Sequence, residues 1–247
     1  MKIVFTVFAL AFVCLAASGG PDEGGYYWYD QEEDTQFFNE NWVDISSTGT
    51  YMGPGDDTFW FAGELGFDFV FYGDQKDSVF ISSNGTIVFR DVYLGWGFTH
   101  FPALNSCFVD ALVAPWWCDL DADEEGGIYY QEFSDHFVVM WNEVPPWVES
   151  GAPSYYVTCI IIGWESPDGV TESDIAFLYN SSSYEPNGSS GMQGTRYMGT
   201  ELQYMPLLCE PGNWNLLTQS DDPFGSSSLS NLTWAAIKTS LQPQFGE

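Results

Sequence analysis

The sequence predicts an all-β fold, an antiparallel β-sandwich with long loops that forms a single domain. Two observations support this prediction. Short apolar or alternating segments recur along the chain, and proline and glycine lie between these segments rather than inside a helical pattern. No convincing amphipathic helix precedes residue 200. Because 45% of the 247 residues are hydrophobic, the chain can bury the core that a sandwich requires.

The first predicted strands surround a hairpin. Phe67, Phe69 and Phe71 alternate with other residues, which is the period of two of a strand with one buried face. Apolar segments lie on both sides of Ser83-Asn84-Gly85. Because Asn-Gly tolerates the positive φ that tight turns need, this is the strongest hairpin signal in the chain.

Further strands are predicted as far as residue 179. They lie at 78–82, 86–89, 111–117, 128–131, 137–144, 155–164 and 174–179. Ser134-Asp135 indicates a second tight turn between two of them. The segment 155–164 is apolar on both faces, as expected of a central strand of a sandwich.

The remaining segments carry weaker signals. Residues 22–41 are acidic and aromatic, and we expect them to form a lead-in that lays aromatic side chains onto the core. Residues 181–191 are rich in serine, glycine and asparagine, which predicts a surface loop. Residues 229–241 fit a short helix and a final strand equally well.

The first 18 residues have the layout of a secretory signal peptide. Lys2 supplies a positive charge, an apolar run broken only by Thr6 extends from Ile3 to Ala17, and small residues follow. This run is too short to span a bilayer comfortably. We therefore expect cleavage after Ser18, a domain at 19–247 with no membrane span, and a protein that is secreted, extracellular or at the cell surface.

The charge balance excludes several classes of partner. There are 35 Asp and Glu residues against 5 Lys and Arg, a formal charge of -30. Nucleic acids and anionic lipids both need a basic surface, so neither is an expected partner. Cations are the natural small partners of such a surface. Removal of Lys2 with the signal peptide leaves four basic residues: Lys76, Arg90, Arg196 and Lys238.

Four cysteines remain after cleavage: Cys107, Cys118, Cys159 and Cys209. An even number of cysteines in an oxidising compartment predicts two disulfides, for which three pairings exist. A straight strand between Cys107 and Cys118 would hold them too far apart, so we expect either of them to bond to Cys159 or Cys209. Free buried cysteines are the alternative.

Four sequons offer sites for N-linked glycans in a eukaryotic host. Their asparagines are Asn84, Asn180, Asn187 and Asn231. In a chain rich in serine, threonine and asparagine, such sequons also arise by chance.

The search for catalytic motifs predicts a protein that is not an enzyme. The two histidines, His100 and His136, lie outside any HExxH motif, and there is no GxSxG or Walker loop. His136 follows a turn and opens a strand, which indicates a turn or edge residue.

An acidic loop is the best candidate for a metal site. Asp119, Asp121 and Asp123 leave a predicted strand and enter a glycine-rich loop. Hard carboxylate oxygens that converge on one loop suit Ca²⁺. The spacing departs from an EF-hand, so a solvated acidic turn is the alternative. The pairs at 56–57 and 221–222 are expected to be solvated.

Carbohydrate chemistry is a second class of function. Tryptophans can stack on sugar rings, although tryptophans in strands are more often part of the core. The candidates are Trp116, Trp117, Trp141, Trp147 and Trp164. Paired carboxylates would also suit an acidic glycoside hydrolase, but in a chain with 35 acids some pair always fits.

A set of short motifs follows a specific order between Gly25 and Tyr179. They are Tyr27-Trp28-Tyr29-Asp30, Trp42-Val43-Asp44-Ile45-Ser46, Leu65-Gly66-Phe67-Asp68-Phe69, Phe71-Tyr72-Gly73, Ile81-Ser82-Ser83-Asn84-Gly85, Val88-Phe89, Ala114-Pro115-Trp116-Trp117-Cys118-Asp119-Leu120, Tyr129-Tyr130, Val139-Met140-Trp141-Asn142-Glu143-Val144 and Asp174-Ile175-Ala176-Phe177-Leu178-Tyr179. In this order they resemble a recurrent β domain of secreted and surface proteins of bacteria and archaea, related to the nidogen-type (NIDO) domain.

The resemblance implies a non-catalytic extracellular module, often appended to proteases or adhesins. It covers 25–179 and leaves 180–247 as a C-terminal extension. Large appended partners are not evident here, which favours a stand-alone surface, matrix or assembly subunit. The Asp-rich loop of the family coincides with Asp119 to Asp123, which adds modest support for Ca²⁺.

We therefore expect a secreted structural or adhesive β-sandwich protein whose partners are other extracellular proteins or further copies of itself. Edge strands can pair with a neighbour, while the large negative charge opposes pairing at low ionic strength. Association would then depend on Ca²⁺ or salt. A carbohydrate-binding module that recognises glycans is the alternative, and an acidic glycoside hydrolase is the third candidate.

Overall fold

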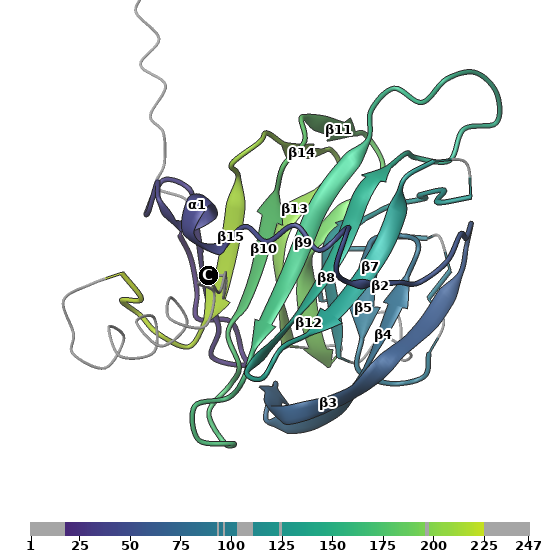
Figure 1. Ribbon diagram of the computed structural model, residues 1–247. Helices are drawn as coiled ribbons and strands as arrows, with labels where there is room; N and C mark the ends of the chain where they lie inside the picture. Colours follow the sequence, from purple (N-terminus) through teal and green to yellow (C-terminus); the bar gives the residue numbers. More distant parts are fainter. Residues whose placement is uncertain are drawn as a thin grey trace, which may run out of the picture.

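The computed structural model describes residues 18–224, except residues 93, 96, 103–110, 124, 196 and 197. Within this part, the chain forms strands β1 to β15 and one short helix, α1 (Phe37–Asn41). The strands build two large sheets that pack face to face (Figure 1). All pairs of neighbouring strands in these sheets are antiparallel. The predicted all-β sandwich is confirmed.

The first sheet has the strand order β1-β15-β10-β9-β8-β7-β2. Its strands are β1 (Tyr27–Asp30), β15 (Trp214–Thr218), β10 (Ile175–Tyr179), β9 (Val157–Trp164), β8 (His136–Val144), β7 (Gly127–Glu132) and β2 (Thr50–Tyr51).

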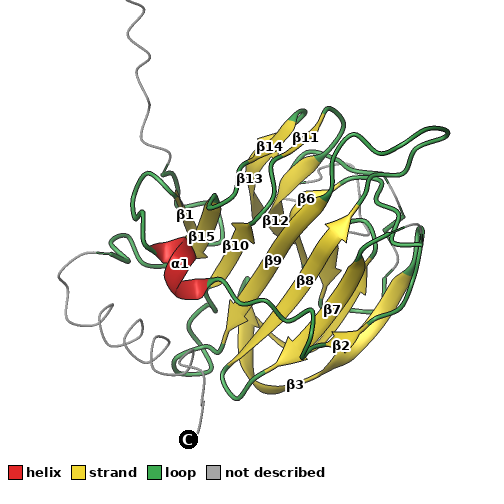
Figure 2. Cartoon of the chain, turned by 45° about the horizontal axis from the view of Figure 1, so that its top comes forward, coloured by secondary structure: helices red, strands yellow, loops and turns green. Residues whose placement is uncertain are grey.

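The second sheet has the order β13-β12-β6-β5-β4-β3. Its strands are β13 (Met198–Tyr204), β12 (Ser189–Thr195), β6 (Leu112–Trp117), β5 (Thr86–Val88), β4 (Asp74–Ser82) and β3 (Phe59–Phe71). A small antiparallel pair, β11 (Ser183–Glu185) and β14 (Leu207–Cys209), lies at one end of the sandwich (Figure 2).

Both predicted turns are present. Residues 133–135 join β7 to β8, and residues 83–85 join β4 to β5 with Ser82 opposite Thr86. In the second of these turns Gly85 has a φ of +73°, and an added Cβ would lie 1.9 Å from the carbonyl oxygen of Trp116. Only glycine fits this position, because the turn lies directly against the backbone of β6.

The main core lies between the two sheets. Phe69 and Phe71 of β3 are fully buried there, as their alternation predicts. Phe69 meets Phe137 of the opposite sheet with ring centroids 5.3 Å apart. The indole of Trp141 also reaches across and donates a hydrogen bond to the Ser82 carbonyl at 3.1 Å. Each such side chain contributes about 1.5–3 kcal/mol by leaving water.

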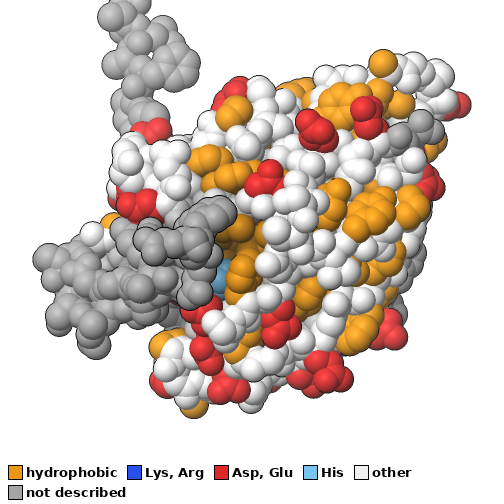
Figure 3. Space-filling view, in the orientation of Figure 1, with side chains coloured by type: hydrophobic (Ala, Val, Ile, Leu, Met, Phe, Trp, Pro, Cys, Tyr) orange, Lys and Arg blue, Asp and Glu red, His pale blue; other side chains and the backbone are white. Residues whose placement is uncertain are grey.

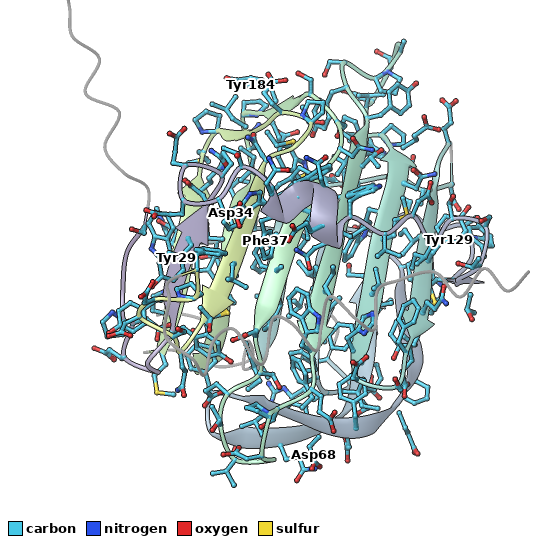
Figure 4. All side chains as sticks on the ribbon, turned by 60° about the vertical axis from the view of Figure 1, so that its left-hand side comes forward. Tyr29, Asp34, Phe37, Asp68, Tyr129 and Tyr184 are labelled. Carbon is cyan, nitrogen blue, oxygen red and sulfur yellow. The ribbon has the colours of Figure 1, made fainter. Side chains whose placement is uncertain are left out.

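A second apolar layer covers the outer face of the first sheet. Residues 31–49, which we call the strap, run from β1 past α1 and across the sheet to β2 (Figure 1). Phe37 of α1 packs against Trp214 with ring centroids 4.4 Å apart (Figure 4). Ile45, further along the strap, is fully buried. The predicted aromatic lead-in therefore packs as expected.

The strap explains why the central strands are apolar on both faces. Residues of β9 contact the inter-sheet core on one side and the cluster under the strap on the other. Every residue of β9 is buried. The predicted central strand at 155–164 is thus confirmed, with its first residues lying in the preceding loop.

The surface loop predicted at 181–191 is wrong. Residues 183–185 form β11, and β12 begins at Ser189. Ser189 and Ser190 are buried because β12 lies between β6 and β13, where the sheet ladders pair its backbone on both sides. Small polar side chains fit this crowded position. Because serine, glycine and asparagine are also the usual residues of loops, the composition of the segment predicted a loop instead of a strand.

Residues 180–218 complete both sheets. They supply the strands from β11 to β15, and β15 lies between β1 and β10 in the interior of the first sheet. The segment predicted as a C-terminal extension therefore contributes to the same sandwich as 25–179. The predicted signal peptide up to residue 17 and the segment 229–241 lie outside the described residues.

A pair of glycine substitutions tests how tightly the β4–β5 turn is packed. Gly85→Ala is expected to lower the free energy of unfolding by about 2–4 kcal/mol, because it combines a left-handed backbone with a collision against Trp116. Urea unfolding followed by tryptophan fluorescence measures this change.

Gly73→Ala is the matched control for this substitution. Its φ is +79°, but an added Cβ would meet nothing within 4 Å, so only the backbone term of about 1 kcal/mol remains. Equal losses in the two variants would contradict the packing that we describe.

Candidate metal centre

Three segments that are distant in sequence meet beside the end of β6. The loop after β6 is joined to the segment before β3 by a hydrogen bond from the Ala122 N–H to the Gly55 carbonyl at 3.1 Å. It is joined to the segment after β8 by a bond from the Asp121 N–H to the Pro145 carbonyl at 2.9 Å. Backbone bonds therefore hold the loops together independently of their charges.

Three carboxylates converge at this junction. Asp56, Asp57 and Asp119 each offer an oxygen atom, and these three oxygens lie within 4.8 Å of one another. Asp56 and Asp57 are exposed, whereas Asp119 is half-buried. We call these three residues the carboxylate cluster.

Asn84 positions two members of the cluster. Its amide nitrogen donates to Asp57 Oδ1 at 2.8 Å, and its amide oxygen accepts the Leu120 N–H at 2.9 Å. The side chain is completely buried within the β4–β5 turn. Asn84 therefore links the segment that carries Asp57 to the segment that carries Asp119.

The cluster is electrostatically unfavourable without a cation. Burial, followed by the nearby charges of Asp57 and Asp56, raises the pKa of Asp119 to about 6. Burial and the charge of Asp121 also raise the pKa of Asp56. Within the described part of the chain, the ion pairs that form do not include the three cluster residues. Like charges are thus held together without an ion pair to a described basic side chain.

This arrangement suits a hard divalent cation. Ca²⁺ binds six to eight oxygen atoms, which carboxylates, backbone carbonyls and water can supply together. The three carboxylates would provide the charged part of such a set, and a bound cation would relieve their mutual repulsion.

The structure does not bring the three predicted metal ligands, Asp119, Asp121 and Asp123, together at one site. It brings Asp119 together with Asp56 and Asp57, the pair that was expected to be solvated. Asp121 Oδ1 instead accepts the Asp123 N–H at 2.9 Å, which stabilises the loop, and Asp123 is exposed. Asp56 and Asp57 are exposed, as expected, but their position beside Asp119 could not be predicted because a fold contact, not a motif, places them there.

The described cysteines do not form disulfides. Cys118, Cys159 and Cys209 are buried free thiols. Two of the thiols contact oxygen atoms: Cys118 Sγ lies 3.8 Å from the Tyr155 hydroxyl, and Cys209 Sγ donates to the Ser181 carbonyl at 3.2 Å. Burial raises the pKa of all three thiols, which makes them unreactive. Cys107, the fourth cysteine, lies outside the described residues.

The sequons differ in accessibility. Asn84 is excluded as a glycan site in this fold, because its amide is buried and hydrogen-bonded to Asp57. Asn180 and Asn187 are exposed and remain candidates. Asn231 lies outside the described residues.

The candidate sugar-stacking tryptophans belong mostly to the core. Exposure separates Trp147, which is 47% exposed, from the others, which are 3% exposed or less. The buried ones are Trp116, Trp117, Trp141 and Trp164.

The histidines lie apart from the carboxylate cluster. His100 is exposed and pairs with Glu201 at 2.8 Å. His136 is 1% exposed rather than an edge residue, because its ring stacks on Phe133 with centroids 4.3 Å apart. Burial lowers its pKa, while Asp135 partly offsets this effect.

Comparison with known families matches the chain to a family model. A family model described as NIDO related matches residues 29–205 of the chain. The match runs past Tyr179 and includes β12 and β13, so it covers strands of both sheets. No curated protein and no solved structure matches the chain.

Neutralising Asp119 tests the electrostatics of the cluster. Because its pKa is raised to about 6, above the ordinary value of about 3.9, ionised Asp119 destabilises the folded state above pH 6. Asp119→Asn is therefore expected to raise the melting temperature at pH 7–8 in EDTA. The difference from the unmodified protein should vanish as the pH falls toward about 4.

Asp77→Asn serves as the control, since Asp77 is an exposed residue of β4. Thermal unfolding from pH 4 to pH 8 would compare the three proteins. A melting temperature lower for Asp119→Asn than for Asp77→Asn at pH 8 would show that the cluster is not repulsive.

Proposed function

The chain belongs to the NIDO-related family, and from this membership and the carboxylate cluster we propose that it is a secreted structural or adhesive protein of the cell surface or extracellular matrix. It is non-enzymatic, and its association with other extracellular proteins or with further copies of itself depends on Ca²⁺ or salt. The observation that carries the proposal is the convergence of Asp56, Asp57 and Asp119 without an ion pair among the described residues.

A cation at the cluster would act as a structural tie. Asp57 and Asp119 belong to segments that Asn84 already connects, and Asp56 lies in a backbone bridge with Asp121. A Ca²⁺ ion would replace the repulsion among these carboxylates with shared coordination. The loops at this end of the sandwich would then become more stable and better able to present a fixed surface.

The edges and charge of the sandwich support regulated association. β3 is an edge strand of the second sheet, and its Phe61 is 55% exposed beside Phe80. Such an edge offers backbone groups and an apolar ring to a neighbour. A charge of -30 opposes the approach of two copies, and acidic groups are spread over the face seen in Figure 3. Divalent cations or salt reduce this repulsion.

Several features support the proposed extracellular location and the proposed non-enzymatic function. The first 18 residues have the layout of a signal peptide, and the matching family is typical of extracellular proteins. Within the described ranges, no helix has the length and apolar character needed to cross a membrane. His136 is 1% exposed and stacked on Phe133, which disfavours it as a catalytic base.

Calcium titration tests the proposed site. We expect the purified protein to bind one Ca²⁺ in isothermal titration calorimetry and to melt at a higher temperature in CaCl₂ than in EDTA. At a concentration 100 times the dissociation constant, binding should add about 2.7 kcal/mol of stability. Asp56→Asn and Asp119→Asn should each weaken binding about tenfold or more, whereas Asp77→Asn should not.

Light scattering tests association separately from binding. The protein is compared in EDTA at low salt, in EDTA with NaCl, and in CaCl₂ at matched ionic strength. A larger particle in CaCl₂, lost in Asp119→Asn, would support association through the cluster. A size that is the same under all three conditions would refute the proposed dependence on Ca²⁺ or salt.

A further inference from the structure

A cavity of about 270 Å³ lies between the two sheets at the end opposite β3 in strand order. Residues of β1 and β15 of the first sheet line one side, and residues of β13 of the second sheet and of β14 line the other. The volume is slightly below the ~300–1,000 Å³ of sites for drug-sized ligands, so it suits a ligand of one ring.

The wall formed by β1 combines an aromatic ring with a carboxylate. Trp28 and Asp30 are two residues apart on β1 and therefore point to the same side. Trp28 packs against the inter-sheet core, whereas Tyr29 points to the outer face of the sheet (Figure 4). Hydrogen bonds between Trp28 and Gly19 at 2.9 and 3.1 Å fix the backbone at the indole. The backbone of β1 at Trp28 is thus hydrogen-bonded to Gly19 on one side and to β15 on the other, which holds the indole at the cavity.

Amide side chains line much of the remaining surface. Asn215 lies opposite Asp30 in the β1–β15 ladder, and Gln31 follows Asp30. Among the hydrogen bonds of the described residues, none uses the side-chain amide of Gln31 or Asn215. Asn213 accepts the Glu210 N–H at 2.7 Å, which leaves the donor end of its amide available. The cavity therefore offers both donors and acceptors.

Hydrogen bonds connect the two strands of the opposite wall. Both ends of the Gln203 amide are held by the backbone of Leu208, with Nε2 donating to the carbonyl at 3.1 Å and Oε1 accepting the N–H at 2.8 Å. This pair joins β13 to β14. The wall thus keeps its shape when the cavity is empty, which lowers the entropic cost of binding.

Asp30 adds a buried acceptor. It is 7% exposed, and its described hydrogen bond is from the Glu32 N–H to Oδ1 at 3.0 Å. Burial raises its pKa, and the hydrogen bond from the Glu32 N–H partly offsets this effect. A ligand hydroxyl could donate to this carboxylate, and hydroxyl groups could also both donate to and accept from the neighbouring amides.

We propose that this cavity binds a single neutral sugar ring, with Trp28 stacking on the apolar face of the ring and Asp30, Gln31 and Asn215 bonding its hydroxyls. An aromatic surface with a few convergent polar groups is the usual composition of a site for such a ligand. The mixture of amide donors and acceptors favours hydroxyl groups over an ammonium group, which could use only the acceptors. The site is distinct from the carboxylate cluster and does not depend on Ca²⁺.

Two arms of one experiment test the sugar site and distinguish free sugars from glycans. An array of immobilised glycans is probed with the labelled protein in EDTA, and saturation-transfer NMR is recorded with free glucose, galactose, mannose, N-acetylglucosamine and N-acetylgalactosamine. We expect binding to at least one terminal sugar class on the array. A signal with the free monosaccharide as well would show that one ring suffices.

Variants locate the binding. Gln31→Ala and Asn215→Ala should each weaken binding about tenfold, the loss expected from a hydrogen bond of about 1.4 kcal/mol. Gln36→Ala is the matched control, because Gln36 is an exposed amide of the same segment outside the cavity. Circular dichroism and the melting temperature confirm that each variant folds.

Three results would overturn the proposal. One is the absence of any sugar signal from the folded protein in both arms. Another is sugar binding that Gln31→Ala and Asn215→Ala leave unchanged. The third is preferential binding of Nα-acetyl-lysine amide, tested by the same NMR method and abolished by Asp30→Asn, which would assign the cavity to a cationic side chain.

Discussion

The carboxylate cluster depends on the burial of one turn against the end of β6. Gly85 brings the β4–β5 turn so close to Trp116 that no side chain fits between them. Asn84, beside it, must then satisfy its amide inside the protein, and it does so with Asp57 and the Leu120 backbone. The packing of the second sheet thus determines where the acidic segments meet, and their meeting creates the charge repulsion that a cation would relieve.

The two sites proposed here use the same sandwich in different ways. The carboxylate cluster lies on loops that backbone bonds join, and its charges oppose one another. The cavity lies between the sheet edges, where polar residues replace the apolar filling found between the central strands. A cation would stabilise the first site, whereas a neutral ligand would fill the second. Under the two proposals, the molecule would combine ion-dependent association with recognition of a small ligand.

The strand pattern was predictable because local periodicity carries it. The phenylalanines before residue 72 and the Asn-Gly turn at 84–85 both led to correct elements. β12 was not predictable in the same way, since its serines are buried only through pairing with β6 and β13. The same limit applies to the sites. The loop sequence predicts Asp119 as a candidate ligand, but the approach of Asp56 and Asp57 to Asp119 and the cavity beside Trp28 arise from contacts between distant segments.

A crystal structure determined in the presence of Ca²⁺ would test the central claim most directly. The account predicts one ion bound by oxygens of Asp56, Asp57 and Asp119 at about 2.3–2.6 Å, with the Asn84 bonds to Asp57 and Leu120 retained. Ordered carboxylates without an ion at saturating Ca²⁺, or an ion bound only elsewhere, would contradict it.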